Sequence, residues 1–479
     1  MPIENYEKVI WLEIHVRVKS ETKFFCNCKN AVDLALEPNI NVCPVCMWFP
    51  WMLPSLNSEV VRLWVKAGLL MNCEINKISR FDRKSYFYPD LPNSFQITQM
   101  YEPITWPWIV KVMINGEVRE FSIHHMHLEN DAWKLIHSGW QTLCDYNRVW
   151  SPLMEIVTDP VFKDKEEVME FLKEIQKMFR FGDVSDADMD KWQLRCDVNV
   201  SIRKVWDPKL GTRAELKNLN SFSSIGRAID NEFLRQVRIL DAGWVIEQET
   251  RWWDDDKWIS TTQRSKEDAM DYRYFPEPDL LPIVLDDEYI ENIKKELWEL
   301  PVLKRIRYLN DYKLWEDDSR ILTSDKELSE YFEEMVTLTG DPKKSCSYIT
   351  TILLALLNDC KEVWWICNLK FEARELANVI SLVNKDELSS TNSKIVVEEL
   401  FKAWGKADEI VDKLWLRQKN DTDALEKIVD EVLLKLWDQI AEYKSWKENL
   451  FWFFVGQCMK ASAWKWNPKI FTDIIKKKI

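Results

Sequence analysis

Apolar and polar residues alternate strictly in several segments of the N-terminal half of this chain. Residues 9–19 (VIWLEIHVRVK) and 194–203 (LRCDVNVSIR) each place an apolar side chain at about every second position. Successive side chains of a strand point to opposite faces of a sheet, so each segment predicts a strand with one buried and one polar face. The second segment continues through a turn into TRAELKNLNSF, which predicts a β-hairpin between residues 194 and 222.

A helical period replaces this alternation elsewhere. Apolar residues recur every three to four positions at 164–181 and 223–240, and Gly182 and Gly243 follow these two segments. Beyond about residue 295 the patterns stay helical to the end of the chain. We therefore predict an α+β fold, in which a domain built on a mainly antiparallel sheet with flanking helices is followed by all-α domains.

The polar faces of the predicted strands carry the residues best suited to chemistry. Two further segments are read as strands: IHHMHLENDAWK (residues 123–134), which would align His125, His127, Glu129 and Asp131 on one face, and SPLMEIVTDP (residues 151–160). The candidates from all these strands are Glu13, His15, Glu129, Glu155, Asp197 and Glu215. Glu155 lies in an otherwise apolar strand, where a charge is costly unless it is paired or binds a cation. Carboxylates with one imidazole suit Mg²⁺, which also keeps waters and nucleotide phosphates in its shell. The set predicts a metal site for phosphoryl transfer, although a solvated strand face also carries charges.

Other routes to nucleotide binding or catalysis are absent from the sequence. Neither G-x-x-x-x-G-K-[ST] nor G-x-G-x-x-G is legible, and no Ser/His/Asp or Cys/His arrangement stands out. We therefore expect a nucleotide to bind through metals in a carboxylate-lined cradle. Residues 80–104, with Arg83, Lys84 and many aromatic residues, predict either a loop on the rim of this site or a loop that covers the core.

Two cysteine pairs lie close together near the N-terminus. Cys26 and Cys28 are followed by Cys43 and Cys46 in VCPVC. Four thiolates at such spacing are typical of a structural zinc site, with free thiols as the alternative. The chain has 11 cysteines, an odd number, which argues against a disulfide framework.

Composition and charge narrow the class of protein. The 479 residues suffice for two to four domains, and the longest apolar runs fall far short of the roughly 18 residues that a membrane span needs. With no leader legible in MPIENYEKVI, we expect a cytoplasmic protein without membrane contact. The net charge of −14 argues against nonspecific nucleic-acid binding over the whole surface. Six lysines gather near the end of the sequence: Lys460, Lys465, Lys469, Lys476, Lys477 and Lys478. They predict a local basic patch, with a tail that only aids solubility as the alternative.

The tryptophan content is anomalous. The chain has 26 tryptophans and 10 glycines, and their total of 36 is close to the about 34 glycines that ordinary usage predicts. Several tryptophans occupy turn-like sites beside proline or aspartate, where a residue that tolerates positive φ is favoured. We hypothesise that many of these positions are glycine in the cell and that a UGA codon has been translated here under the wrong code. The alternative is a truly tryptophan-rich protein.

Ordered motifs over essentially the whole chain resemble the B subunit of the bacterial aspartyl/glutamyl-tRNA amidotransferase family. They include WLEIHV, CPVCMWFPWMLP, FDRKSYFYPDLP, MHLENDAWK, LRCDVNVSIR, AELKNLNSF, DYRYFPEPDL and FFVGQCMKAS. The family has glycine where this chain has Trp11, Trp48, Trp51, Trp133, Trp150 and Trp192, which supports the recoding hypothesis. Asn130 departs from the family pattern, which often has Glu there, so a ligand role at this position is in doubt.

The resemblance implies a three-part chain. Residues 1–295 would form a catalytic cradle with a four-cysteine zinc loop, 296–405 a helical domain, and 406–479 a helical tail that contacts tRNA through the basic patch. ATP would phosphorylate the side-chain carboxylate of Glu-tRNA(Gln) or Asp-tRNA(Asn), and ammonia would displace the phosphate. The ammonia would come from glutamine through a separate amidase subunit, and a third, small subunit would clamp the pair.

Site residues follow from the same resemblance. The Mg²⁺ ligands would be Glu13, His15, Glu129, Glu155 and Glu215, and Asp197 would complete the catalytic set. Lys84 and Lys217 would hold phosphate or guide ammonia. Zn²⁺ would bind Cys26, Cys28, Cys43 and Cys46. Two alternatives from other classes are a non-catalytic carrier of tRNA and a stand-alone carboxylate-amine ligase that acts without tRNA.

Overall fold

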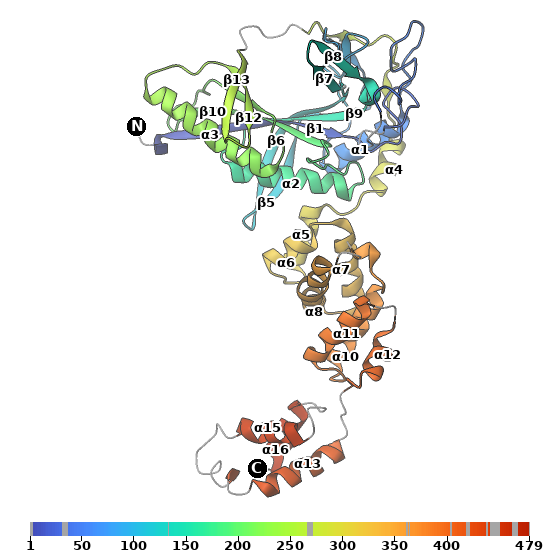
Figure 1. The fold of residues 1–479 in the computed structure, drawn as a ribbon, viewed down its shortest axis with the longest axis vertical. Coiled ribbons are helices and arrows are strands. Elements are labelled where there is room, and N and C mark those ends of the chain that lie inside the picture. The colour runs from blue at the N-terminus through green and yellow to red at the C-terminus, as the bar shows by residue number, and fades with distance from the viewer. Residues whose placement is uncertain are drawn as a thin grey trace. The chain divides into compact units, whose positions relative to one another are not determined.

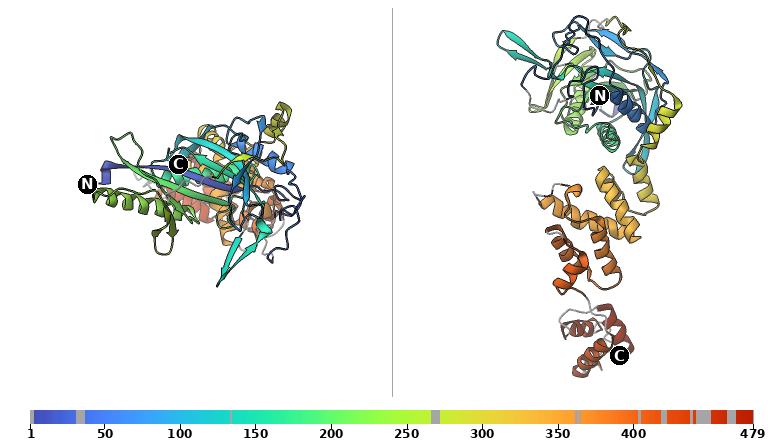
Figure 2. Two further views of the ribbon diagram at one scale, coloured as in Figure 1. Left: turned by 90° about the horizontal axis from the view of Figure 1, so that it is seen from above. Right: turned by 90° about the vertical axis from the view of Figure 1, so that its right-hand side faces the viewer.

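The chain forms two compact units, Met1–Lys304 and Arg305–Ile479 (Figure 1). The structure is a computed structural model that describes residues 3–30, 37–132, 134–265, 272–360, 363, 365–402, 405–417, 422–436, 439–440, 451–461 and 468–478. Figure 2 shows two further views, in which the first unit is coloured from blue to yellow and the second unit from yellow to red. The predicted boundaries at residues 295 and 405 stay predictions.

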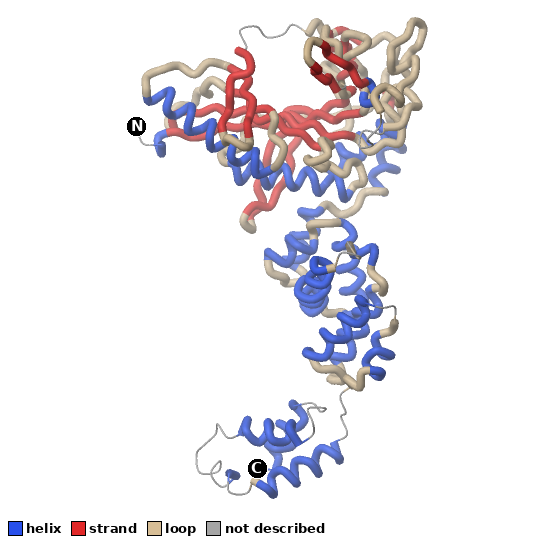
Figure 3. The backbone as a smooth tube through the Cα atoms, in the orientation of Figure 1, coloured by secondary structure: helices blue, strands red, loops and turns tan. Residues whose placement is uncertain are grey.

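An eight-stranded sheet organises the first unit. Strands are drawn in red in Figure 3. The strand order of the sheet is β13-β12-β11-β10-β1-β9-β6-β5. Its neighbouring strands are antiparallel except β11 and β12, which are parallel. This confirms the predicted α+β class, and β10 and β11 form the predicted hairpin. The strands are β1 (Tyr6–Arg17), β5 (Trp108–Ile114), β6 (Glu117–Asn130), β9 (Pro152–Thr158), β10 (Leu194–Lys204), β11 (Ala214–Lys217), β12 (Glu249–Asp254) and β13 (Ile259–Ser265).

Short strands join segments that are far apart in the sequence. A three-stranded sheet has the order β14-β3-β4, β15 pairs with β2, and β7 pairs with β8. The β14–β3 pairing brings Phe275 and Pro276 of DYRYFPEPDL against Arg83 and Asp82 of FDRKSYFYPDLP. These strands are β2 (Ile78–Ser79), β3 (Asp82–Ser85), β4 (Phe95–Thr98), β7 (Lys134–Ser138), β8 (Gln141–Asp145), β14 (Phe275–Pro276) and β15 (Ile283–Val284).

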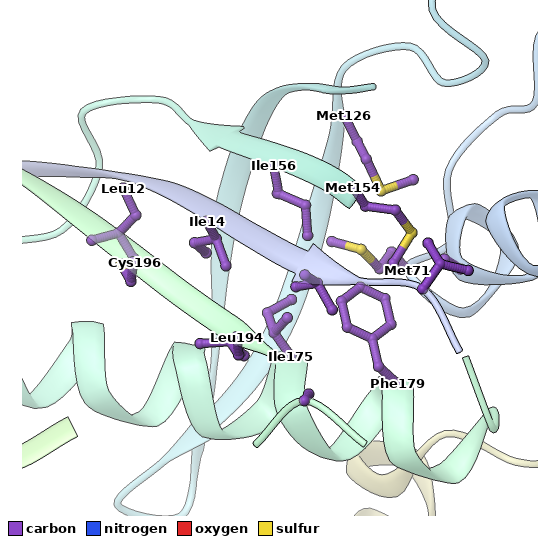
Figure 4. Close-up of a cluster of buried hydrophobic side chains, with 14 of the residues drawn as sticks. Leu12, Ile14, Met71, Met126, Met154, Ile156, Ile175, Phe179, Leu194 and Cys196 are labelled. Atoms are coloured by element: carbon purple, nitrogen blue, oxygen red, sulfur yellow. The ribbon is translucent and has the colours of Figure 1, made fainter. Parts of the chain in front are cut away.

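Helices α2 (Lys165–Phe181) and α3 (Phe222–Asp241) pack on the apolar side of the large sheet, and α1 (Ser58–Leu70) and α4 (Asp287–Lys295) complete the unit. Helix α2 begins where the Asp164 carboxylate accepts a hydrogen bond from the backbone N–H of Glu167, and it ends at Gly182. Ile175 and Phe179 pack against apolar side chains of β1 and β10 (Figure 4). The opposite, polar face of the sheet therefore remains available for chemistry.

The second unit is helical among the residues described. Its helices enclose two apolar clusters, one that includes Phe332 and Leu376 and one that includes Phe454 and Phe471. No helix in the described part of the chain is long and apolar enough to cross a membrane. The helices are α5 (Pro301–Asn310), α6 (Glu316–Leu322), α7 (Lys326–Thr339), α8 (Pro342–Tyr348), α9 (Leu354–Asp359), α10 (Ala373–Asn384), α11 (Ser390–Lys402), α12 (Ala407–Lys413), α13 (Thr422–Lys435), α15 (Phe451–Ala461) and α16 (Pro468–Lys478).

Six of the described tryptophans adopt a left-handed backbone. Bulky residues rarely adopt positive φ, because their Cβ approaches the following carbonyl oxygen. The buried indole nitrogens of Trp64, Trp108 and Trp150 also have no hydrogen-bond partner in the described structure, although such groups usually find one. Both observations support the hypothesis that many of the tryptophan positions are glycine in the cell. The six are Trp48 (φ 54°), Trp51 (φ 68°), Trp150 (φ 64°), Trp192 (φ 59°), Trp258 (φ 55°) and Trp415 (φ 57°).

Replacing Trp51 by glycine is expected to stabilise the first unit, since its side chain is 94% exposed and packs against little. Relief of the left-handed strain is worth about 1–2 kcal/mol, and the extra freedom of glycine in the unfolded chain offsets roughly 0.5–1 kcal/mol of it. Trp206, which is 66% exposed and has ordinary φ, is the matched control. Urea denaturation should show W51G more stable and W206G less stable than the parent, and a loss of stability in both variants would contradict the strain argument.

Candidate active site on the polar face of the sheet

Strand register brings most of the predicted site residues together on the polar face of the large sheet. Glu13 of β1 lies opposite Asp197 of β10, and His15 of β1 lies opposite Glu155 of β9. Glu155 in turn lies opposite His127 of β6. Residues two apart on a strand share a face. Strands β1, β6, β9 and β10 therefore place these side chains on one surface, which we call the floor.

His15 is the centre of the acidic side of this floor. Its Nε2 atom lies 3.5 Å from a carboxylate oxygen of Glu129, 3.5 Å from one of Glu155 and 3.9 Å from one of Glu13. Glu129 and Glu155 are buried, whereas Glu13 and His15 are half-buried. Glu13, His15 and Glu155 each offer a ligand atom within 4.8 Å of the other two, which is close enough to hold one metal ion.

A second group lies on β10 and β11. The Lys217 ammonium forms ion pairs with Asp197 and, at 2.9 Å, with Glu215. The Thr250 hydroxyl of β12 donates a hydrogen bond of 2.9 Å to the Glu215 carboxylate. Because Asp197 lies opposite Glu13, this group joins the floor around His15.

Lys84 reaches the floor from β3. Its Nζ atom lies 4.9 Å from the centroid of the Tyr272 ring. Burial opposes the charge of Lys84, but the carboxylates of Glu129 and Glu155 outweigh this effect and raise its pKa. The neighbouring Arg83 anchors the strand, since its guanidinium donates hydrogen bonds of 2.7 and 2.8 Å to Glu277 after β14.

Two side chains of the floor, Glu13 and His15, have raised pKa values. Burial and the nearby charge of Glu155 raise the pKa of Glu13 to about 7. Burial opposes a charge on His15, but its hydrogen bond to Glu155 and the charges of Glu155 and Glu129 prevail and raise the pKa of His15 to about 9. A divalent cation can bind the same carboxylates and the His15 imidazole when it displaces the protons that these groups carry.

The sequence pattern aligned His127 with His125 and Glu129 on one strand face, but His127 was not among the predicted site residues. Its Nε2 atom lies 3.5 Å from Glu155 and 3.9 Å from Glu129. The cluster of histidines between residues 124 and 137 was the available signal.

Asn130 faces away from the floor, because its side-chain oxygen accepts a hydrogen bond of 2.7 Å from the backbone N–H of Ile97. Its departure from the family pattern therefore leaves the floor intact.

The four N-terminal cysteines form a separate cluster. Cys26, Cys28, Cys43 and Cys46 place their sulfurs within 4.8 Å of one another, close enough to hold a metal ion. The Cys46 sulfur accepts a hydrogen bond of 3.1 Å from the backbone N–H of Cys43, and the buried Lys23 ammonium lies 3.9 Å from it. A hydrogen bond from Cys26 lowers the pKa of Cys46 to about 5 against the effect of burial, and Lys23 adds to the decrease.

The predicted basic patch belongs to α15 and α16. Lys460 and Lys476–Lys478 are exposed, and the Lys478 ammonium forms an ion pair of 2.6 Å with Asp430. Lys476 lies 5.8 Å from the centroid of the Phe451 ring. Lys465 and the side chain of Lys469 lie outside the described residues.

Residues 8–291, which include the large sheet and its acidic floor, match the family model described as the GatB/GatE catalytic domain. Residues 330–479 match the model described as the GatB domain. The B subunit of an aspartyl/glutamyl-tRNA(Asn/Gln) amidotransferase from Persephonella marina is 42% identical over 98% of this chain and 99% of its own length. The corresponding protein of Caldicellulosiruptor bescii is 40% identical over 99% of both chains. The chain belongs to the family of aspartyl/glutamyl-tRNA(Asn/Gln) amidotransferase B subunits, which confirms the resemblance found in its motifs.

Proposed function

We propose that this chain is the ATP-dependent kinase and transamidase subunit of a complex that amidates mischarged Glu-tRNA(Gln) or Asp-tRNA(Asn). The observation that carries the proposal is the convergence of Glu13, Glu129 and Glu155 on His15, with Asp197 and Glu215 beside them. Relatives that match the chain over its full length are named as one subunit of such an amidotransferase. ATP and Mg²⁺ are the cofactors of this proposal.

The donor set fits Mg²⁺, since carboxylate oxygens dominate it. Bound there, Mg²⁺ would neutralise the phosphate charge that develops during phosphoryl transfer. The γ-phosphoryl group passes from ATP to an oxygen of the substrate carboxylate, and ADP leaves. Ammonia then forms a bond to the acyl carbon and expels phosphate. Lys84 from β3 and Lys217 from β11 hold phosphate oxygens or guide the ammonia.

Partners and the remaining sites extend the proposal. The ammonia comes from a separate amidase subunit, and a small third subunit holds the two larger ones together. Zn²⁺ at the cysteine cluster would tie residues 26–28 to residues 43–46. The lysines of α15 and α16 contact the tRNA backbone, where phosphates favour cationic side chains.

One observation favours the carrier function. Trp11 lies two residues from Glu13 on the same face of β1, opposite Asn199, and its ring lies 5.6 Å from the Arg213 guanidinium. An indole on this floor takes space that a nucleotide needs. If position 11 is glycine in the cell, the floor is open.

The deciding experiment measures ATP hydrolysis by the complete complex with and without Glu-tRNA(Gln), for the chain as given and for Trp11→Gly. Stimulation by tRNA in either form supports the proposed kinase. Failure of both forms, with tRNA still bound, supports the carrier. Turnover of a free amino-acid carboxylate without tRNA supports the stand-alone ligase.

A further inference from the structure

A β-bulge in β6 places two imidazoles beside the floor. Ile123 pairs with Thr158 and His125 pairs with Val157, so His124 is an extra residue in the ladder. From His125 onward the strand again alternates, which sets His125, His127 and Glu129 on one face. Bulges of this kind re-aim side chains and are common beside functional sites.

The two imidazoles converge on Glu155. His125, His127 and Glu155 each offer a ligand atom within 4.8 Å of the other two. The rings of His125 and His127 are stacked, with centroids 5.2 Å apart and planes 26° apart. The Nδ1 atom of the buried His127 has no hydrogen-bond partner in the described structure. Since buried polar atoms are normally partnered, this atom points to a ligand that the chain itself does not supply.

We propose that His125, His127 and Glu155 bind a divalent transition-metal ion such as Zn²⁺. Two imidazoles and one carboxylate favour zinc, cobalt or nickel over Mg²⁺, which prefers oxygen ligands alone. The site is distinct from the proposed Mg²⁺ set around His15, because it uses two histidines that this set does not contain. It is also distinct from the cysteine cluster, with which it shares no residue.

His124 supports this site as a positioning residue. Its Nδ1 atom lies 2.7 Å from Nδ1 of His125, which is a hydrogen-bond distance. Metal-binding histidines usually engage their second ring nitrogen in such a bond, which fixes the ring and its tautomer. This bond leaves Nε2 of His125 as the ligand atom.

The transition-metal site competes with the floor for Glu155. The same oxygen of Glu155 lies 3.5 Å from Nε2 of His15 and 3.5 Å from Nε2 of His127. An ion held by His125 and His127 therefore draws this carboxylate away from Mg²⁺. This competition rests on the proposed function, so Zn²⁺ is expected to inhibit tRNA-dependent ATP hydrolysis. Metal binding by the three residues does not depend on that function.

Cobalt is a suitable probe, because its visible absorption distinguishes nitrogen and oxygen ligands from thiolates. The full-length chain is first loaded with one equivalent of Zn²⁺ to occupy the cysteine cluster and is then titrated with Co²⁺ in the presence of Mg²⁺. We expect one Co²⁺ site without thiolate bands. His125→Gln should weaken it at least tenfold and His124→Gln by less, since loss of a positioning partner alone has a smaller effect. His137→Gln, on the exposed β7–β8 hairpin, is the matched control and should bind as the parent does.

Equal Co²⁺ affinity in the parent and in His125→Gln, with unchanged circular dichroism, would overturn the proposed site. Weakened binding in the His137→Gln control as well would also overturn it, because the ion would then be held by exposed histidines in general. In the complete complex, relief of Zn²⁺ inhibition by His125→Gln supports competition for Glu155. Inhibition that His125→Gln does not change refutes the competition. Absence of any ATP turnover refutes the proposed function and leaves the Co²⁺ titration as an independent result.

Discussion

Replacing Glu155 by glutamine is expected to lower tRNA-dependent ATP hydrolysis by the complete complex about 10²–10³-fold, as loss of one main electrostatic group in an active site does. Glu155 lies between His15 and His127 and also interacts with Lys84. Burial opposes ionisation of this carboxyl, but these three cationic groups outweigh it and lower its pKa. A neutral amide keeps the shape of the side chain and removes the charge that the cations and Mg²⁺ require.

Glu117→Gln is the matched control, since Glu117 lies exposed at the start of β6 in the same sheet. Rates are measured by ADP release over a range of Mg²⁺ concentrations, with circular dichroism as a check of folding. We expect E117Q to keep the parent rate. A folded E155Q complex that retains more than a tenth of the rate would show that the floor is not the site of phosphoryl transfer.

The second large effect is expected at the cysteine cluster. Cys46→Ala should lower the zinc content of the purified chain by about one ion per chain, because three thiolates bind structural zinc far less tightly than four. Metal binding also stabilises the loop that carries the ligands, so the variant should be cleaved faster by protease within residues 26–46. Plasma emission spectrometry and limited proteolysis provide the two measurements.

Cys73→Ala separates loss of metal from loss of a buried thiol. Cys73 is buried in the same core as Cys46 but belongs to no cysteine cluster among the described residues. The C73A variant should retain zinc and the protease resistance of the loop. Zinc retained in full by C46A would contradict a four-cysteine site, and a parent chain that binds no zinc would identify the cysteines as free thiols.

Local pattern was sufficient to predict the elements that carry the chemistry. Period-two alternation identified β1 and β10, and the unexpected charge of Glu155 in an apolar strand marked β9. Because side chains on one strand alternate between faces, the polar residues of each strand could be assigned to a common surface before their neighbours were known. The helices α2 and α3 followed from their apolar period and their glycine ends.

Non-local features were beyond such reasoning. The parallel pairing of β11 with β12, and the pairing of β3 with the far more C-terminal β14, depend on tertiary packing that no local period records. The bulge at His124 likewise adds one residue to the ladder without a clear signature in IHHMHLEND. The alternation in this segment did place His125 and His127 on the face of Glu129, but their approach to Glu155 of β9 depends on strand pairing and is evident only in the structure.

In the part of the chain that the structure describes, helices cover one face of the large sheet, and this separates two kinds of constraint along a single strand. On β1, Leu12 and Ile14 face the core beside α2, whereas Glu13 and His15 face the floor. Evolution can therefore revise reactivity at the odd-numbered positions while leaving the even-numbered ones to maintain the scaffold. New chemistry in this architecture needs exchanges at alternate residues rather than a new backbone.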